Sequence, residues 1–341
     1  MKRLSPFTFL LGALLLHAED NAKPFNTQKL TTPLLKPAEA LKAITVPKGF
    51  RVRLSAAEPM VQQPIDMAWD ARGRLWVAEC YTYAEKETNF EKKLKDRIII
   101  LEDTNQDGVF DKRKVFWNGA SQLTSIEIGF GGVWAACAPN ILFLADKNND
   151  DKPDGKPEVI LDGFDTDKVR HNIVNGLRWG PDGWLYGCHG VFTNSWVGTI
   201  GAPREERQFI DAGIWRYHPI TREFEIFARG LSNPWGFDFN DTGQGFATCC
   251  VIPHLFHVVQ GGVYHKQSKQ HVNPFVYDDI KTIRDHTHKS AHGGARFYLA
   301  DTFPARYRDR LFMCNIHQHM VLTDIMEPKG SSYIGKHGDD F

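Results

Sequence analysis

A short hairpin pattern that recurs five times along the chain constrains the fold more than any other feature. Its clearest copies are "PIDMAWDARGRLWVAE" (Pro64 to Glu79), "VNGLRWGPDGWLYGCHG" (Val174 to Gly190) and "NPWGFDFNDTGQGFATCC" (Asn233 to Cys250). Each copy is an apolar strand, a turn of the D-x-x-G kind or similar, and a second apolar strand, which predicts a tight hairpin. Weaker copies run from Ser125 to Asp146 and from Ala295 to Ile316.

The spacing of these copies indicates how they are assembled. The equivalent aromatic residues are separated by 61, 49, 60 and 59 positions, and they are Trp69, Phe130, Trp179, Phe239 and Tyr298. A repeat of about 57 residues made of short strands is typical of propeller blades with four strands each. A β-sandwich is the alternative, but it would not explain a hairpin that recurs at blade spacing. We therefore predict an all-β chain that folds as a β-propeller.

The predicted propeller occupies residues 44–341, and two segments precede it. Residues 1–18 contain two basic residues, the apolar run Phe7 to Leu16 and then Ala18, which is the pattern of a secretory signal peptide. Residues 19–43 are dotted with Pro and Lys and predict a linker. We expect an exported protein, periplasmic or associated with the cell envelope. Because a propeller closes its ring to satisfy its edge strands, and about five blades fit here, we expect the propeller to be incomplete at the C-terminus.

Composition excludes some classes of partner and cofactor. Lys and Arg number 41, as do Asp and Glu, so no net field favours nucleic acid or an anionic membrane. The six cysteines mostly lie in apolar, strand-like runs, which predicts buried free thiols. The sequence has no C-x-x-C-H motif for covalent haem and no C-x-x-C pair for zinc. Four tryptophans lie inside the hairpin repeats, and most of them are predicted to be packing residues: Trp69, Trp179, Trp184 and Trp235.

Two acidic runs, "DTNQDGVFD" and "DKNNDDKPD", share the spacing of calcium-binding loops. Oxygen ligands at positions 1, 3, 5 and 9, with the carbonyl of position 7, can surround a calcium ion. The predicted side-chain ligands are Asp103, Asn105, Asp107 and Asp111 in the first loop, and Asp146, Asn148, Asp150 and Asp154 in the second. Asp151 replaces the glycine of the first loop, and neither loop has Glu at position 12. The alternative is a solvated hairpin built from Asx-turns; a structural role is favoured over a catalytic one.

Histidines concentrate in the second half of the chain. The stretch "RDHTHKSAHGG" places an arginine beside three imidazoles: Arg284, His286, His288 and His292. Polar residues just before the inner strands of a propeller converge on its central funnel, which places His171 and Asn233 there. A positioned imidazole can take a proton from a substrate hydroxyl. The alternatives are hydrogen-bonded structural histidines, or a transition-metal site formed by the three histidines of the stretch.

Several longer motifs carry a family resemblance. "RWGPDGWLYGCHG", "GLSNPWGFDF", "VIPHLFHVVQGG" and "YDDIKTIRDHTH" resemble the PVC-type membrane-bound dehydrogenases, whose propeller is similar to that of glucose/sorbosone dehydrogenase. The resemblance covers about Ile44 to Phe341. It implies a six-bladed propeller related to calcium-dependent quinoprotein sugar dehydrogenases, which use pyrroloquinoline quinone. Members of the family often continue into helical repeats and a cytochrome c domain.

The resemblance also implies roles for individual residues. The general-base histidine of the sugar dehydrogenases falls on His171, and the Arg-Asn-Pro that holds the quinone falls on Ser232, Asn233 and Pro234, so the arginine is absent here. His254 resembles the histidine of an E-H-G-P segment, without its acidic neighbour. The predicted cofactor-binding residues are Asn233, His254, Arg284, His286, His288 and His292.

These observations favour an exported dehydrogenase that oxidises a sugar or alcohol hydroxyl. Its electrons would pass to a quinone and onward to a cytochrome. Two alternatives stay open: a non-catalytic propeller that binds a glycan or a protein, and a calcium-dependent lactonase or esterase. The last would need a metal at the centre of the funnel, ligated by side chains from several blades.

Overall fold

The computed structural model describes residues 34–84, 88–167, 171–250, 254–266, 278–284 and 291–341. The predicted signal peptide, His286 and His288 lie outside these ranges. The end of the predicted linker contains a short helix, α1 (Pro37–Ala43), which has no buried residue. Among the helices in the described ranges, none is long and apolar enough to span a bilayer.

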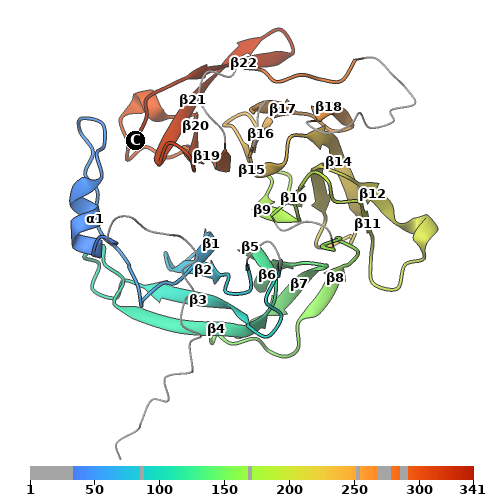
Figure 1. The fold of residues 1–341 in the computed structure, drawn as a ribbon, viewed down its shortest axis with the longest axis horizontal. Coiled ribbons are helices and arrows are strands. Elements are labelled where there is room, and N and C mark those ends of the chain that lie inside the picture. The colour runs from blue at the N-terminus through green and yellow to red at the C-terminus, as the bar shows by residue number, and fades with distance from the viewer. Residues whose placement is uncertain (1–33, 85–87, 168–170, 251–253, 267–277, 285–290) are drawn as a thin grey trace, which may run out of the picture. The chain divides into compact units, whose positions relative to one another are not determined.

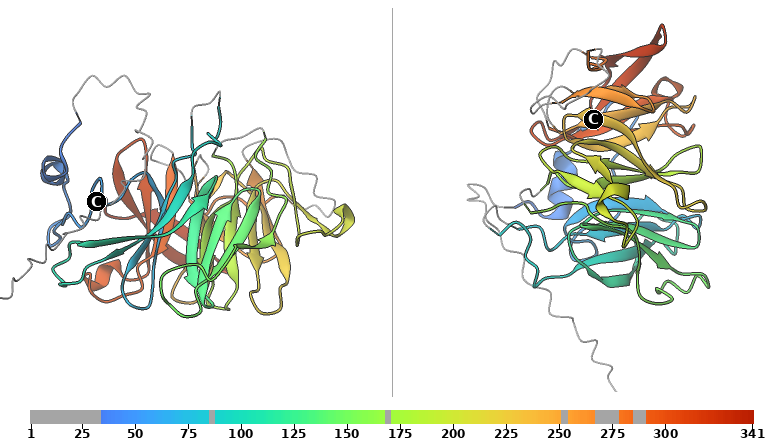
Figure 2. Two further views of the ribbon diagram at one scale, coloured as in Figure 1. Left: turned by 90° about the horizontal axis from the view of Figure 1, so that it is seen from below. Right: turned by 90° about the vertical axis from the view of Figure 1, so that its right-hand side faces the viewer.

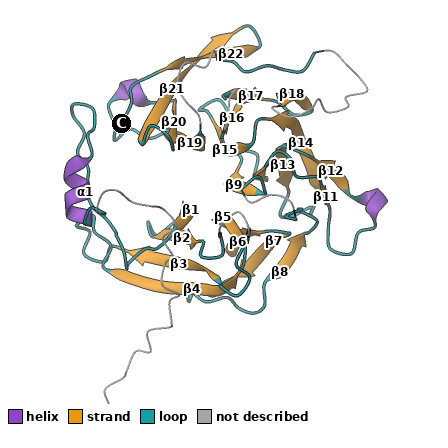
Figure 3. Ribbon diagram, in the orientation of Figure 1, coloured by secondary structure: helices purple, strands orange, loops and turns teal. Residues whose placement is uncertain are grey.

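The strands of the described residues form five successive sheets and one separate hairpin (Figure 3). The first sheet contains β1 (Pro64–Trp69), β2 (Leu75–Glu79), β3 (Asp96–Glu102) and β4 (Lys112–Ala120), and the second contains β5 (Leu123–Gly129), β6 (Gly132–Cys137), β7 (Asn140–Ala145) and β8 (Glu158–Leu161). The third contains β9 (Asn175–Trp179), β10 (Leu185–His189), β13 (Gly213–Tyr217), β14 (Phe224–Leu231) and β18 (Gly262–Lys266). The fourth contains β15 (Pro234–Phe239), β16 (Gly245–Cys249) and β17 (Phe256–Val258), and the fifth contains β19 (His292–Phe297), β20 (Arg310–Asn315), β21 (Met320–Lys329) and β22 (Ser332–His337). The hairpin pairs β11 (Ser195–Val197) with β12 (Gln208–Ile210).

These five sheets are the blades of a β-propeller, as predicted. The first two strands of each sheet are the recurring hairpins of the sequence, and all neighbouring strands are antiparallel except β14 and β18. The innermost strands contact one another in order, β1 with β5, β5 with β9, β9 with β15 and β15 with β19. Figures 1 and 2 show the sheets following one another around a common axis. Each aligned aromatic residue ends its innermost strand or directly follows it.

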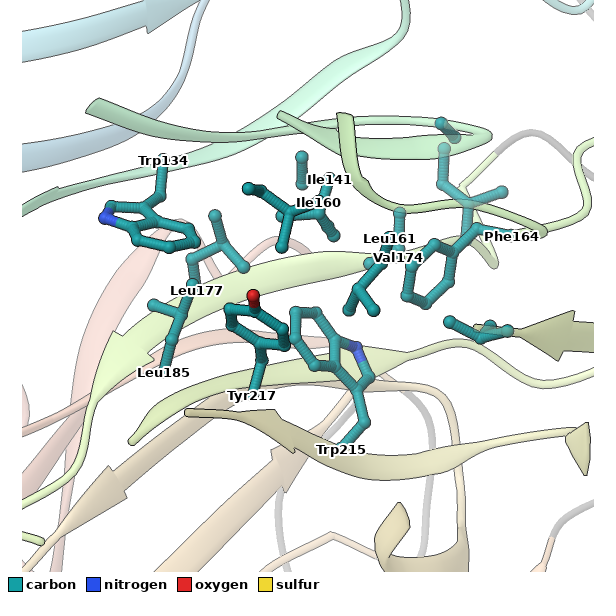
Figure 4. Packing of buried hydrophobic residues seen from close by; sticks show 14 of the residues in the cluster. Trp134, Ile141, Ile160, Leu161, Phe164, Val174, Leu177, Leu185, Trp215 and Tyr217 are labelled. Carbon is teal, nitrogen blue, oxygen red and sulfur yellow. The ribbon is translucent and has the colours of Figure 1, made fainter. Parts of the chain in front are cut away.

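Apolar side chains between adjacent blades form the core. Figure 4 shows the cluster between the second and third blades, in which Trp134 is 3% exposed and Trp215 is fully buried. Burial of many large apolar side chains supplies most of the favourable free energy of folding in such a β-fold. Among the four tryptophans of the hairpins, Trp69 is not a packing residue, because it is 61% exposed. Alternation along β1 places Ile65, Met67 and Trp69 on one face, and the described part of the chain leaves that face open to solvent.

Side chains of the innermost strands also fix the register between blades. In each case an oxygen in one blade accepts a backbone N–H of the next blade. The pairs are Asp66 with Ile126 at 3.1 Å, Ser125 with Leu177 at 2.8 Å, and Asp238 with Phe297 at 2.8 Å. Buried polar groups of this kind need such partners, so a shift of one blade would leave them unsatisfied.

The segment before β1, residues 47–63, connects the two ends of the row of blades, and we call it the strap. Phe50 packs edge-to-face on three aromatic rings of the fifth blade region: Phe303, Tyr307 and Phe341. Further along, the Arg53 guanidinium donates to the carbonyl of Asp107 in the first blade. The strap therefore contacts both the last blade and the first.

Five of the six cysteines hold equivalent places, at or beside the end of the second strand of a blade: Cys80, Cys137, Cys188, Cys249 and Cys314. All six are free thiols, and the first four of these are buried, as predicted. Burial raises the pKa of Cys80 and Cys249 to about 12. Thiols in this state are poor nucleophiles, so they act as small core residues.

Candidate functional site at the mouth of the propeller

The described site residues gather at one end of the blades, which we call the mouth. The start of each innermost strand lies opposite the end of the second strand, as in the pairs Asn175 with Cys188 and Pro234 with Cys249. Residues that precede innermost strands therefore share one end of the molecule with residues that follow second strands. Of the predicted residues, His171, Asn233 and His292 lie at these starts, and His254 precedes β17 at the same end.

A buried charged cluster at the mouth joins three predicted residues with one that the sequence did not indicate. The imidazoles of His254 and His292 stack with their centroids 3.9 Å apart. His254 Nε2 lies 3.3 Å from Asp324 Oδ2, and the guanidinium of Arg284 bonds to the other oxygen of the same carboxylate. Neither histidine nor Asp324 is exposed, and Arg284 is 6% exposed. The cluster thus couples the fourth and fifth blades through one ion pair and two imidazoles.

Asp324 was missed because it interrupts an apolar strand, "MVLTDIM", without any accompanying motif. It belongs to β21, and its side chain points into the space between blades rather than to solvent. Removing one partner of a buried ion pair leaves the other charge uncompensated, which typically costs about 3–5 kcal/mol. A lone acid in an apolar run is therefore the signal that could have indicated a paired, buried charge.

His171, the predicted base, is exposed at the mouth, directly before the third blade. Its Nδ1 lies 3.5 Å from the hydroxyl of Tyr83, which the connection between β2 and β3 carries across from the first blade. The next residue, Asn172, packs so closely on Gly190 that a Cβ there would lie 2.3 Å from the Asn172 carbonyl carbon. The Thr193 hydroxyl also donates to the Asn172 carbonyl. Close backbone packing of Asn172 thus fixes the position of the His171 backbone at the mouth.

His189 is a buried scaffold residue beside this segment. Its Nδ1 donates to the carbonyl of Gly190 at 2.8 Å, and its Nε2 accepts from the Ser195 hydroxyl at 2.7 Å. The same hydroxyl accepts the backbone N–H of Asp165 at 2.8 Å. Burial lowers the pKa of His189 to about 4, so it is neutral at physiological pH. Its role is to hold Gly190 and the segment near Asp165 in place.

Three buried oxygens at the starts of β9 and β15 have no hydrogen-bond partner among the described residues: Asn175 Oδ1, Ser232 Oγ and Asn233 Oδ1. The Asn175 amide donates to the carbonyl of Pro234 at 3.2 Å, so the two strand starts touch. Asn233 also has a left-handed φ of 59°, a conformation that asparagine tolerates better than most residues. Unpaired buried oxygens of this kind are uncommon and favour a ligand or water that donates hydrogen bonds.

These groups do not fit an anionic quinone in the way the family resemblance implies. Ser232 stands where that resemblance expects an arginine, and the charge of Arg284 is already matched by Asp324. The unpartnered atom of Asn233 is an acceptor and that of Ser232 is a neutral hydroxyl, whereas the carboxylates of a quinone are held most strongly by cations. The described residues of the mouth therefore lack the charged anchor that this cofactor needs.

The two acidic loops lie at the opposite end of the blades, in the β3–β4 and β7–β8 connections. They share one fold: Asp103 accepts the N–H groups of Asp107 and Gly108 at 3.2 and 2.7 Å, and Asp146 accepts those at positions 150 and 151 at 3.0 and 3.1 Å. Asn105 also accepts the N–H of Asp107 at 3.0 Å, and Asn148 accepts that of Asp150 at 3.1 Å, as expected for the Asx-turn alternative. No group of three or more His, Cys, Asp or Glu within the described ranges is arranged to hold a metal ion. Calcium binding by these loops stays a prediction.

The blades and the mouth together define a β-propeller with the fold of the sugar dehydrogenases. Over residues 36–341 the chain matches the family described as Domain of unknown function (DUF7133), and it belongs to that family. No curated protein matches the chain.

Solved structures share the fold at low sequence identity. A glucose dehydrogenase-type oxidoreductase from Thermus thermophilus is 17% identical, with a TM-score of 0.54 over 82% of this chain and 84% of that one. The PQQ-bound aldose sugar dehydrogenase of Streptomyces coelicolor is 13% identical, with a TM-score of 0.52 over 82% and 81%. A further structure, named glucose dehydrogenase, is 14% identical, with a TM-score of 0.53 over 81% and 86%.

Proposed function

We propose that the chain is the propeller of an oxidoreductase that oxidises a hydroxyl group of a sugar or an alcohol at the mouth. The observation that supports this most directly is the position of His171. Its imidazole is exposed at the mouth, held by close backbone packing, on a fold that sugar dehydrogenases share. Because imidazole ordinarily titrates near neutral pH, an exposed histidine is suited to accept a hydroxyl proton.

The residues of the mouth would have three different roles. His171 would take the proton of the substrate hydroxyl as the carbon-bound hydrogen leaves as hydride to a bound two-electron acceptor. The buried amide oxygens of Asn175 and Asn233 need hydrogen-bond donors, and the Ser232 hydroxyl can donate or accept. The hydroxyls of a sugar, or bound water, would supply partners for all three. The His254–Asp324–Arg284 cluster would fix the wall of the mouth between the fourth and fifth blades.

Three further features belong to the same proposal. We infer that the protein is exported, on the pattern of residues 1–18. A cytochrome would accept the electrons, as the resemblance to the membrane-bound dehydrogenases implies. Calcium would bind the acidic loops at the far end of the blades and stabilise them without taking part in the reaction.

A non-catalytic propeller is the second candidate, and one observation favours it. The arginine in the mouth is fully matched by a buried aspartate, so no described residue at that position offers a free positive charge to a quinone. In this case the mouth would bind a glycan or a protein without oxidising it.

The test is an oxidation assay on the exported protein with a panel of sugars and alcohols and the dye dichlorophenolindophenol as electron acceptor. The assay is run without added cofactor and then with pyrroloquinoline quinone and calcium. His171→Ala is the test variant. His218→Ala is the matched control, because His218 lies at the β13–β14 turn, away from the mouth.

Dye reduction that His171→Ala abolishes and His218→Ala preserves supports a dehydrogenase with His171 as base. A requirement for added quinone would show that residues other than Ser232 and Arg284 hold that cofactor. If no substrate reduces the dye under either condition, the dehydrogenase proposal is wrong. Sugar binding by calorimetry would then support the second candidate.

A further inference from the structure

The described part of the connection between β2 and β3, residues 80–84 and 88–95, reaches from the first blade to the boundary of the second and third blades, and we call it the arm. At its base, the buried carboxylate of Asp96 accepts the backbone N–H and the hydroxyl of Thr82, both at 2.7 Å. The same carboxylate accepts the N–H of Leu123 from the second blade at 2.9 Å. The base of the arm is therefore fixed to two blades at once.

The far part of the arm is anchored by an aromatic side chain. Phe90 is 6% exposed and belongs to the apolar cluster that contains Phe164, Ile173 and Val174. Ile173 and Val174 lie two and three residues after His171, so the arm packs on the very segment that carries the predicted base. Because burying a phenylalanine removes a large apolar surface from water, this contact favours the docked position of the described part of the arm.

Tyr83 lies opposite Phe90 in this docked arm. The two residues form an antiparallel bridge, and their rings meet edge-to-face with centroids 5.9 Å apart. The phenol is 42% exposed, and its oxygen lies 3.5 Å from Nδ1 of His171. The arm of the first blade thus places Tyr83 next to His171, which precedes the third blade.

We propose that Tyr83 is a positioning residue for His171, which rests on the proposed function of the mouth. A base acting through Nε2 needs its proton on Nδ1, and a hydrogen-bond acceptor beside Nδ1 selects that tautomer. The Tyr83 hydroxyl, 3.5 Å away, can donate to Nδ1 or accept from Nδ1–H, and the proposal is that it accepts, which keeps the proton on Nδ1. Nε2 then carries the lone pair.

The test measures the tautomer of His171 by long-range ¹H–¹⁵N NMR of the whole chain labelled at histidine, with His171→Ala to assign the resonance. The spectra are recorded at a pH where the imidazole is neutral. Wild type should show the proton mainly on Nδ1. Tyr83→Phe should shift the proton toward Nε2, the site that histidine favours in water, while its melting temperature stays unchanged. Tyr298→Phe, which removes a hydroxyl in the fifth blade, should leave the tautomer as in wild type.

A wild-type His171 protonated mainly on Nε2, or a tautomer that Tyr83→Phe does not change, would overturn the proposal. The measurement needs neither substrate nor electron acceptor, so its result stands even if the protein oxidises nothing. If the protein does oxidise a hydroxyl, Tyr83→Phe should lower kcat by on the order of tenfold with little change in KM. Because the hydroxyl of Tyr83 orients the base and not the substrate, an equal rise in KM would count against it.

Discussion

Asp151 in the second blade and Arg74 in the first blade form a bidentate ion pair. The two guanidinium nitrogens lie 2.9 and 2.8 Å from the two carboxylate oxygens. Asp151 occupies the place that glycine holds in the first acidic loop, with a left-handed φ of 63°. The substitution that weakens the loop as a calcium motif thus serves a contact between blades, because glycine has no side chain to reach Arg74.

Replacing Asp151 should reduce stability in a pH-dependent way. The hydrogen bonds from Arg74 lower the pKa of Asp151 to about 2, so its contribution is present above about pH 4 and is lost as pH falls through 2. Asp151→Asn should lower the free energy of unfolding by about 2 kcal/mol at pH 7 and by much less at pH 2, measured by urea titration. Asp151→Gly relieves backbone strain as well, so it should lose less. Equal stability of wild type and Asp151→Asn at pH 7 would contradict the ion pair's role.

Glu127 should give the opposite pH dependence. Burial raises its pKa to about 7, although Arg178 lies 3.9 Å away and opposes the shift. Because the unfolded chain loses this proton near pH 4.5, the contribution of Glu127 is present below that pH and is lost as pH rises through 7. Between about pH 4.5 and 8, the free energy of unfolding of Glu127→Gln should fall by on the order of 2–3 kcal/mol less than that of wild type. Glu205→Gln, at an exposed site, is the control and should leave the decline unchanged.

Gly190→Ala should displace the segment that carries His171. The added methyl group would lie 2.3–2.5 Å from backbone atoms of Asn172, which cannot move as a flexible side chain could. We expect a loss of about 1–3 kcal/mol in the free energy of unfolding and an altered His171 resonance by NMR. Gly155→Ala, where a Cβ meets nothing within 4 Å, is the matched control. An unchanged His171 resonance in Gly190→Ala would show that this contact does not place the imidazole.

Calcium should raise the melting temperature if the acidic loops bind it. At a hundred times its dissociation constant, a ligand that binds the folded state alone adds about 2.7 kcal/mol. Asp103→Ala should abolish most of this gain, and Asp146→Ala should abolish less, because the second loop lacks the glycine. The check is a thermal melt with calcium and with a chelator. Identical melts under the two conditions would leave the Asx-turn hairpins as the full account of these loops.

The blades could be predicted because each hairpin is specified by residues that are close together in the sequence. Each hairpin needs only alternation, a short turn and an aromatic residue at a fixed place, and these recur from Trp69 to Tyr298. The buried thiols were predictable for the same reason, since each lies in an apolar strand. The positions of His171 and Asn233 at the mouth followed from their places just before innermost strands.

The rest depends on contacts between segments that are far apart in the sequence. No sequence pattern around Tyr83 indicates its contact with His171, because the two residues belong to different blades and are far apart in the sequence. Asp324 is one acid in an apolar strand, and its partners come from two other segments. The exposure of Trp69 likewise depends on what covers the face of β1, which no local pattern encodes.

The strap can dock only after the last blade has been made. Phe50 finds its aromatic partners in the last blade, and one of them is Phe341. During synthesis Phe50 therefore stays in water until residues 303–341 have left the ribosome. Contacts between such distant residues form late because closing a long loop is entropically unfavourable. The strap thus stays undocked, with its aromatic residue exposed, while all five blades are being made.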